Sequence, residues 1–193
     1  MSPTAPGSAA SADTLAVIST PTRTAPWLAI GSVASAVVLV DQVTKWWAVN
    51  RLESPLELFW TLRLNLAHNT GTAFSLGSGL GPVIGLLAVV IVIVLIRAGK
   101  AVTTRTGAVA LGLVLGGAVG NLLDRLFNNP DGLLGGAVRD FIDLQWWPIF
   151  NIADCGIVIG GALLVLAGLR QGEPGEAAER AESAGSVGRV EHP

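Results

Sequence analysis

The sequence has little charge. Only 13% of its 193 residues are Asp, Glu, Lys or Arg, which is about half the fraction of an ordinary soluble domain. Hydrophobic residues make up 51%, and the mean hydropathy is +0.59. A soluble core of this size would not need so much apolar sequence, so a lipid bilayer is the expected solvent. The formal net charge of -2 provides no basic excess, which argues against nucleic acid as a partner.

Cysteine is nearly absent and tyrosine is absent. The single Cys155 excludes an intrachain disulfide framework and a cysteine metal cluster. His68 has no His or Cys partner at ligand spacing, so we expect no zinc site. The first 26 residues lack a charged segment leading into a short apolar run, which predicts a disordered tail and not a cleavable signal peptide.

Four apolar segments of roughly the ~20 residues of a spanning helix follow. They run from about Trp27 to Val49, Pro82 to Ile96, Thr106 to Phe127 and Pro148 to Leu169. The second is short, but its uncharged stretch reaches back to Ala73. We therefore expect a disordered cytoplasmic tail over 1–26, a four-helix membrane domain over 27–169 and a second disordered cytoplasmic tail over 170–193.

The short connector between the second and third segments contains Arg97, Lys100 and Arg105. The positive-inside rule places such a connector in the cytoplasm. Both termini are then cytoplasmic, and loops 50–81 and 128–147 lie outside. Apolar and polar residues alternate from Leu56 to Leu66, which predicts a strand with one apolar face and a small sheet on the outer membrane surface. The expected fold class is an all-α membrane protein with four transmembrane helices and a small extracytoplasmic β-cradle.

Ionisable side chains inside membrane segments are functional candidates because they are costly to bury. Asp124 lies near the outer end of the third segment and Asp154 near the outer end of the fourth, each within roughly 10 Å of that end. Two facing carboxylates in a low-dielectric site cannot both ionise easily, so one keeps a proton and the pair provides an acid and a base. Such a pair can activate water against a peptide carbonyl.

A short repeated pattern supports this pairing. Asn121 precedes Asp124 by three residues, and Asn151 precedes Asp154 by three residues. Each Asn therefore lies one helical turn before its Asp and is placed to orient it. A proton-coupled transporter with the same acids remains an alternative, although its acids would be spread along the membrane depth. A non-catalytic membrane scaffold is a third possibility, but it gives no reason for the repeated pattern.

The other charged candidates have simpler roles. Asp41 and Lys45 are separated by one helical turn, so we expect a structural ion pair. Arg125 points about 100° away from Asp124 and is expected to reach lipid phosphate or an outer-loop acid. Asp140 and Asp143, in the second outer loop, rank as structural groups and second to the dyad for catalysis.

These residues resemble the motifs of the lipoprotein signal peptidases (signal peptidase II), an intramembrane aspartic peptidase family. The resemblance covers about Trp27 to Leu169. The five motifs, in chain order, are DQVTK at 41–45, NTGTAF at 69–74, GGAVGNLLDR at 116–125, VRDFID at 138–143 and FNIAD at 150–154.

The resemblance implies a multi-pass enzyme of the bacterial plasma membrane, without metal or cofactor. It implies an aspartate dyad of Asp124 and Asp154 that hydrolyses a prolipoprotein already carrying diacylglyceryl on the cysteine after the scissile bond. Substrate-binding or supporting positions then fall on four residues: Asn69, Asn121, Arg125 and Asn151. The expected partners are this prolipoprotein and membrane lipid, and we expect a monomer.

Overall fold

The computed structural model describes residues 26–71, 81–128 and 133–187, with side chains up to residue 169. In chain order, its elements are α1 (Trp27–Arg51), β1 (Leu56–Phe59), β2 (Leu62–Asn69), α2 (Gly81–Ala98), η2 (Gly99–Ala101), α3 (Arg105–Phe127), β3 (Val138–Asp143) and α4 (Ile152–Val187). Within this part of the chain, four helices are long and apolar enough to cross a membrane. The predicted four-helix membrane fold with a small sheet is confirmed.

The start of α4 differs from the sequence prediction. The apolar segment begins at Pro148, whereas the helix begins at Ile152. Asn151 lies directly before the helix, and its Oδ1 accepts from the backbone N of Asp154 at 3.0 Å. The Asp154 carboxylate accepts from the backbone N of Asn151 at 3.2 Å. This reciprocal pair is a capping box, which satisfies two backbone donors at the start of the helix.

The far end of α4 also differs from the prediction. The helix continues to Val187, whereas the sequence analysis expects a disordered tail from residue 170. The segment from 176 to 184 is made of Glu, Ala, Arg and Ser. Glu, Ala and Arg rank among the good helix formers, which accounts for helix where low hydrophobicity had suggested disorder. The tails over 1–25 and 188–193 lie outside the described residues, as do 72–80, where the second segment was expected to be extended.

Small residues set the spacing of the bundle. Gly117 of α3 lies so close to α4 that an added Cβ would overlap the backbone oxygen of Ala153. On the opposite side of α3, a Cβ at Gly116 would lie 2.7 Å from the backbone oxygen of Ala34 in α1. The helix α3 is thereby held between α1 and α4.

The sheet is antiparallel, with strand order β1-β2-β3. The stretch predicted as one strand is a hairpin, because the chain turns at Trp60, whose φ of 50° is left-handed. Strand β2 pairs with β3, so that Arg63 lies opposite Asp143 and Asn69 opposite Val138. Strand β3 is also bridged to the chain just before α4, through Ile142 and Phe150.

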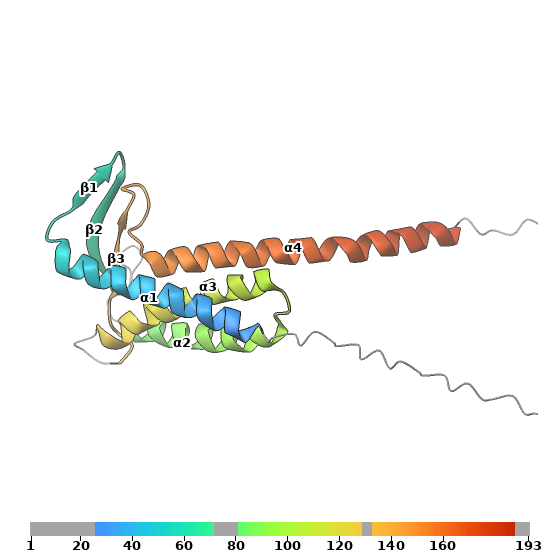
Figure 1. The fold of residues 1–193 in the computed structure, drawn as a ribbon, viewed down its shortest axis with the longest axis horizontal. Helices are drawn as coiled ribbons and strands as arrows, with labels where there is room; N and C mark the ends of the chain where they lie inside the picture. The colour runs from blue at the N-terminus through green and yellow to red at the C-terminus, as the bar shows by residue number, and fades with distance from the viewer. Residues whose placement is uncertain (1–25, 72–80, 129–132, 188–193) are drawn as a thin grey trace, which may run out of the picture.

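Figure 1 shows how these elements meet. The sheet lies at one end of the bundle, where α1 and α3 end and α4 begins. The connection from α2 through η2 to α3 lies at the opposite end. The polar residues of α1, α3, β3 and α4 therefore gather at the sheet end of the bundle.

Candidate active site

Two carboxylates at this end of the bundle are bound by a buried ammonium group. The Nζ atom of Lys45 lies 2.8 Å from Oδ2 of Asp41 and 2.9 Å from Oδ2 of Asp124, and all three side chains are fully buried. The expected Asp41–Lys45 pair is confirmed. The Lys45 ammonium also ties α1 to α3, because Asp124 belongs to α3.

A second cation binds Asp124. The Arg139 Nε donates to Asp124 Oδ1 at 3.1 Å, its backbone N donates to Oδ2 at 3.1 Å, and its Nη2 also contacts Oδ1. Another Arg139 contact reaches Oε1 of Gln42 on α1 at 3.3 Å. Asp124 is thus enclosed between two cations and has no exposed surface. The sequence analysis missed Arg139 and Gln42 as members of this cluster, although both lie inside the quoted motifs.

Two other carboxylates are bound by amide groups. Asp140 on β3 accepts from Asn151 Nδ2 at 2.6 Å and from Asn69 Nδ2 at 3.1 Å. Asp154 accepts from Asn121 Nδ2 at 2.8 Å and from the backbone N of Asn151 at 3.2 Å. In the described part of the chain, neither carboxylate lies within ion-pair distance of a cation. Asn151 contacts both acids and therefore joins them.

Burial and charge act together on Asp140. Burial is the largest influence, and the nearby negative charge of Asp154 adds to it, so the pKa of Asp140 rises to about 6 despite the hydrogen bonds from Asn69 and Asn151. The pKa of Asp143 shifts the other way. Burial raises this pKa, but hydrogen bonds from Arg63, the Gln145 backbone and Asn65 outweigh burial and lower it. The ion pair between Arg63 and Asp143, at 2.7 Å, joins β2 to β3.

The acid that the structure joins to Asp154 is therefore Asp140, whereas the sequence analysis paired Asp154 with Asp124. The two N-x-x-D patterns are not equivalent. The pattern at 151–154 is the capping box of α4, while the pattern at 121–124 lies inside α3. Spacing alone cannot distinguish a cap from a helix interior.

Arg125 is buried, with 7% of its surface exposed. Its Nη1 donates to the Gly136 carbonyl at 3.5 Å, and the carboxylates of Asp140 and Asp124 are its charged neighbours. Of the two expected destinations, lipid phosphate or an outer-loop acid, the structure shows the second, because Asp140 belongs to the outer loop. The Arg125 guanidinium lies below the sheet, next to the acids.

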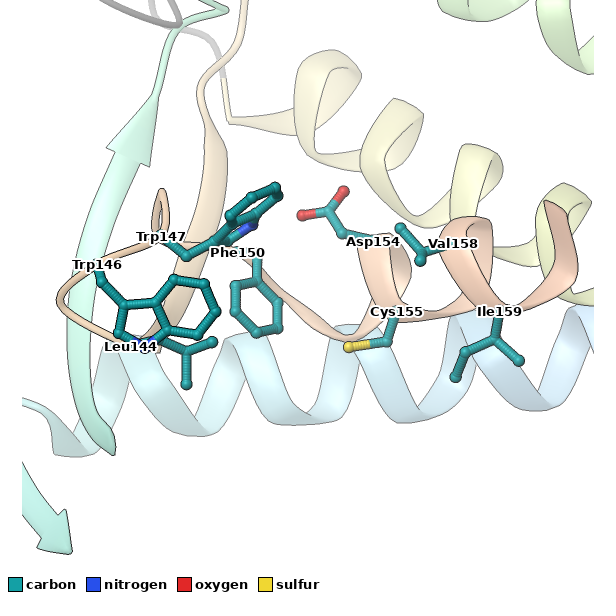
Figure 2. Close-up of a pocket in the computed structure, with 8 residues that line it drawn as sticks. All are labelled: Leu144, Trp146, Trp147, Phe150, Asp154, Cys155, Val158 and Ile159. Atoms are coloured by element: carbon teal, nitrogen blue, oxygen red, sulfur yellow. The ribbon is translucent and has the colours of Figure 1, made fainter. Parts of the chain in front are cut away.

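An apolar pocket of about 430 Å³ opens beside Asp154. Figure 2 shows Asp154 and Cys155 on the first turn of α4, between a group of aromatic rings and the next helical turn. The other lining residues are Leu144, Trp146, Trp147, Phe150, Val158 and Ile159. The pocket therefore brings one carboxylate next to a site that suits an apolar group. No cluster of three or more metal-binding side chains occurs among the described residues.

The family model for signal peptidase (SPase) II matches residues 33–170. The lipoprotein signal peptidase of Rhodococcus jostii (strain RHA1) is 43% identical over 146 residues, which are 74% of this chain and 73% of that protein. The lipoprotein signal peptidase of Mycobacterium avium (strain 104) is 42% identical over 138 residues, 70% of this chain and 75% of that protein.

A solved bacterial membrane enzyme has a similar structure. The TM-score is 0.65 at 30% identity, and the match covers 75% of this chain and 89% of the enzyme. The chain therefore belongs to the lipoprotein signal peptidase (signal peptidase II) family, the membrane-spanning aspartic peptidases that remove signal peptides from prolipoproteins.

Proposed function

We propose that Asp140 and Asp154 form the catalytic dyad of this peptidase. The observation that carries the proposal is that four of the acids at the sheet end of the bundle have two different kinds of partner. Asp41 and Asp124 are neutralised by cations, whereas Asp140 and Asp154 are bound by amides and are joined through Asn151. An acid enclosed by two cations has neither a proton to give nor a free lone pair with which to take one.

Hydrolysis by this pair needs one proton shared between the two carboxyls. The raised pKa of Asp140 makes it the group that holds the proton. Ionised Asp154 then accepts a proton from a water molecule, whose oxygen attacks the scissile carbonyl carbon. Asp140 supplies the proton that the peptide nitrogen needs when the C–N bond breaks. The pair titrates as one unit, so both steps depend on both residues.

The substrate we propose is a prolipoprotein that carries diacylglyceryl on the cysteine after the scissile bond. The pocket beside Asp154 supports this substrate, because its lining consists of aromatic and aliphatic side chains. The acyl chains would reach the site sideways through the bilayer, because moving them through water is costly. We also propose that the enzyme lies in the bacterial plasma membrane, with both termini in the cytoplasm and the sheet outside.

The dyad is tested with purified Asp140→Asn, Asp154→Asn and Asp124→Asn variants and a diacylglyceryl-modified precursor. The first two variants should lose cleavage by at least the ~10²–10⁴-fold that one general acid or base contributes, while keeping a near-normal Tm. Asp124→Asn leaves Arg139 without its carboxylate partner and Lys45 with Asp41 as its one remaining carboxylate partner among the described residues, so it should lower stability by about 3 kcal/mol.

The opposite pattern would restore the pairing suggested by the repeated N-x-x-D sequence. In that case Asp124→Asn would be inactive at full stability, and Asp140→Asn would still cleave. Full cleavage by Asp154→Asn would reject both pairings, Asp140 with Asp154 and Asp124 with Asp154.

A further inference from the structure

The buried ammonium of Lys45 has a third partner besides the two carboxylates. Its Nζ donates to Oδ1 of Asn121 at 3.0 Å. Asp41, Asp124 and Asn121 thus supply three acceptors around one nitrogen. An ammonium has three N–H donors and no acceptor, so the three contacts use its full hydrogen-bonding capacity.

This contact determines which way the Asn121 amide points. Its Oδ1 accepts from Lys45 and, at 3.1 Å, from Nδ2 of Asn151. Because both neighbours are donors, this end of the amide must be the oxygen. The other end must be the NH₂ group, and it donates to Oδ1 of Asp154 at 2.8 Å. A flipped amide would place an oxygen against the Asp154 carboxylate and a donor against the Lys45 ammonium.

The same cluster contacts α4 by a second route. Asp41 Oδ2 is paired with Lys45, and Asp41 Oδ1 accepts from the backbone N of Ala153 at 2.9 Å. Ala153 immediately precedes Asp154 on the first turn of α4. Lys45 therefore holds both the amide that contacts Asp154 and the carboxylate that anchors the turn carrying it.

We infer that Lys45 is a positioning residue of the peptidase, which acts through Asn121 to keep an N–H donor on the Asp154 carboxylate. The inference rests on the proposed role of Asp154 as the base. A donor on the charged form favours that form, so the contact keeps Asp154 able to take a proton from water. A purely structural Lys45 would hold α1 to α3 and leave the chemistry at Asp154 unchanged.

The pH dependence of cleavage can separate these roles. The nearest titratable groups to Asp154 are Asp140 on β3 and Cys155 on α4. The wider cluster adds Asp41 and Lys45 on α1, Asp124 and Arg125 on α3, and Arg139 on β3. Loss of the Asn121 donor should move the acidic limb of kcat/KM to higher pH and should lower kcat/KM by up to ~10²-fold, the scale of a lost positioning contact.

The test is a double-mutant cycle with Lys45→Gln, Asn121→Leu and the double variant, assayed with diacylglyceryl-modified precursor. If Lys45 acts through Asn121, the double variant should keep the acidic limb of Asn121→Leu, and its loss of kcat/KM should be much smaller than the product of the two single losses, because the Asn121 contact is already removed. Independent, additive losses would overturn the inference. A Lys45→Gln enzyme with a lower Tm but the wild-type pH profile would overturn it too.

If Lys45→Gln cannot be purified folded, Asn121→Asp tests the contact to Asp154. This variant keeps an acceptor for Lys45 but replaces the NH₂ group with an oxygen. The acidic limb should move to higher pH and kcat/KM should fall, because the Asp154 carboxylate loses an N–H donor and gains a charged neighbour; a wild-type profile would reject the inference. Asp154→Asn, run in parallel, separates the two ideas. If Asp154→Asn is active, the proposed dyad is rejected. If Asp154→Asn is inactive and the effects of Lys45→Gln and Asn121→Leu are additive, the dyad stands and only the positioning role of Lys45 is rejected.

Discussion

At the scale of single residues, the sequence indicates which residues belong to the site better than it indicates what each one does. Asn69, Asn121 and Asn151 were expected to support the acids, and the structure places each amide on a carboxylate. Spacing alone does not distinguish Asp124 from Asp140. What distinguishes them is the nature of their partners, and Arg139 reaches Asp124 only because β3 folds back onto α3.

The pH dependence provides a prediction at this scale. Asp140 has a raised pKa of about 6, and the proposed mechanism uses its protonated form, so kcat/KM should fall as pH rises through that value. The Asn69 N–H group lowers this pKa. Asn69→Ala removes that donor, so the pKa rises further and the alkaline limb should move to higher pH. The measurement is kcat/KM as a function of pH with lipid-modified precursor.

Asn65→Ala is the matched control. Asn65 lies on the same strand and donates to Asp143 at 3.5 Å, so its loss should leave the alkaline limb in place. An unmoved limb in Asn69→Ala, or an equal movement in both variants, would contradict the assignment of that limb to Asp140.

At the scale of elements, periodicity predicts the helices well and the hairpin poorly. The turn at Trp60 and Thr61 contains no Gly, Pro, Asn or Asp, the residues that ordinarily mark a turn. The alternation of apolar and polar residues consequently continues through the turn, so the sequence of the two strands has the pattern of a single strand. The start of α4 was placed too early because Pro148 belongs to an apolar run, whereas the capping box at Asn151 sets the first helical residue.

The close contact of α3 and α4 gives a prediction about packing. Gly117→Ala should destabilise the bundle by ~1–3 kcal/mol, the usual cost of overpacking, because the new methyl group meets the backbone of Ala153. Gly161→Ala is the control, since an added Cβ there meets nothing within 4 Å. Thermal unfolding in one detergent would compare the two. Equal Tm values would show that α3 and α4 can move apart without cost.

At the scale of the whole molecule, all the polar residues of the site lie at one end of the bundle and the cationic connector lies at the other (Figure 1). Three cations lie in this connector or at its ends: Arg97, Lys100 and Arg105. This separation agrees with the proposed orientation, in which the positive-inside rule places the cationic connector in the cytoplasm. The charge pattern of the sequence was sufficient to predict that the connector and the acids lie at opposite ends.

The orientation is tested by cysteine labelling in a Cys155→Ser background. A membrane-impermeant maleimide added outside intact cells should label Leu133→Cys, whose native side chain is 75% exposed at the sheet end. It should not label Lys100→Cys until the cells are permeabilised. The reverse pattern would place the sheet, and the acids beside it, in the cytoplasm.

One carboxylate of the proposed dyad is carried by a strand and the other by a helix, and this has a consequence for the order of denaturation. The helices satisfy their own backbone hydrogen bonds in the bilayer, whereas β3 depends on β2 and on its short bridge to Phe150. Such a sheet is a candidate for the least stable cooperative unit, the one that opens first as denaturant rises. Opening it would separate Asp140 from Asp154 while the four helices remained inserted. Enzyme activity therefore reports on the docking of the sheet, and circular dichroism reports on the bundle.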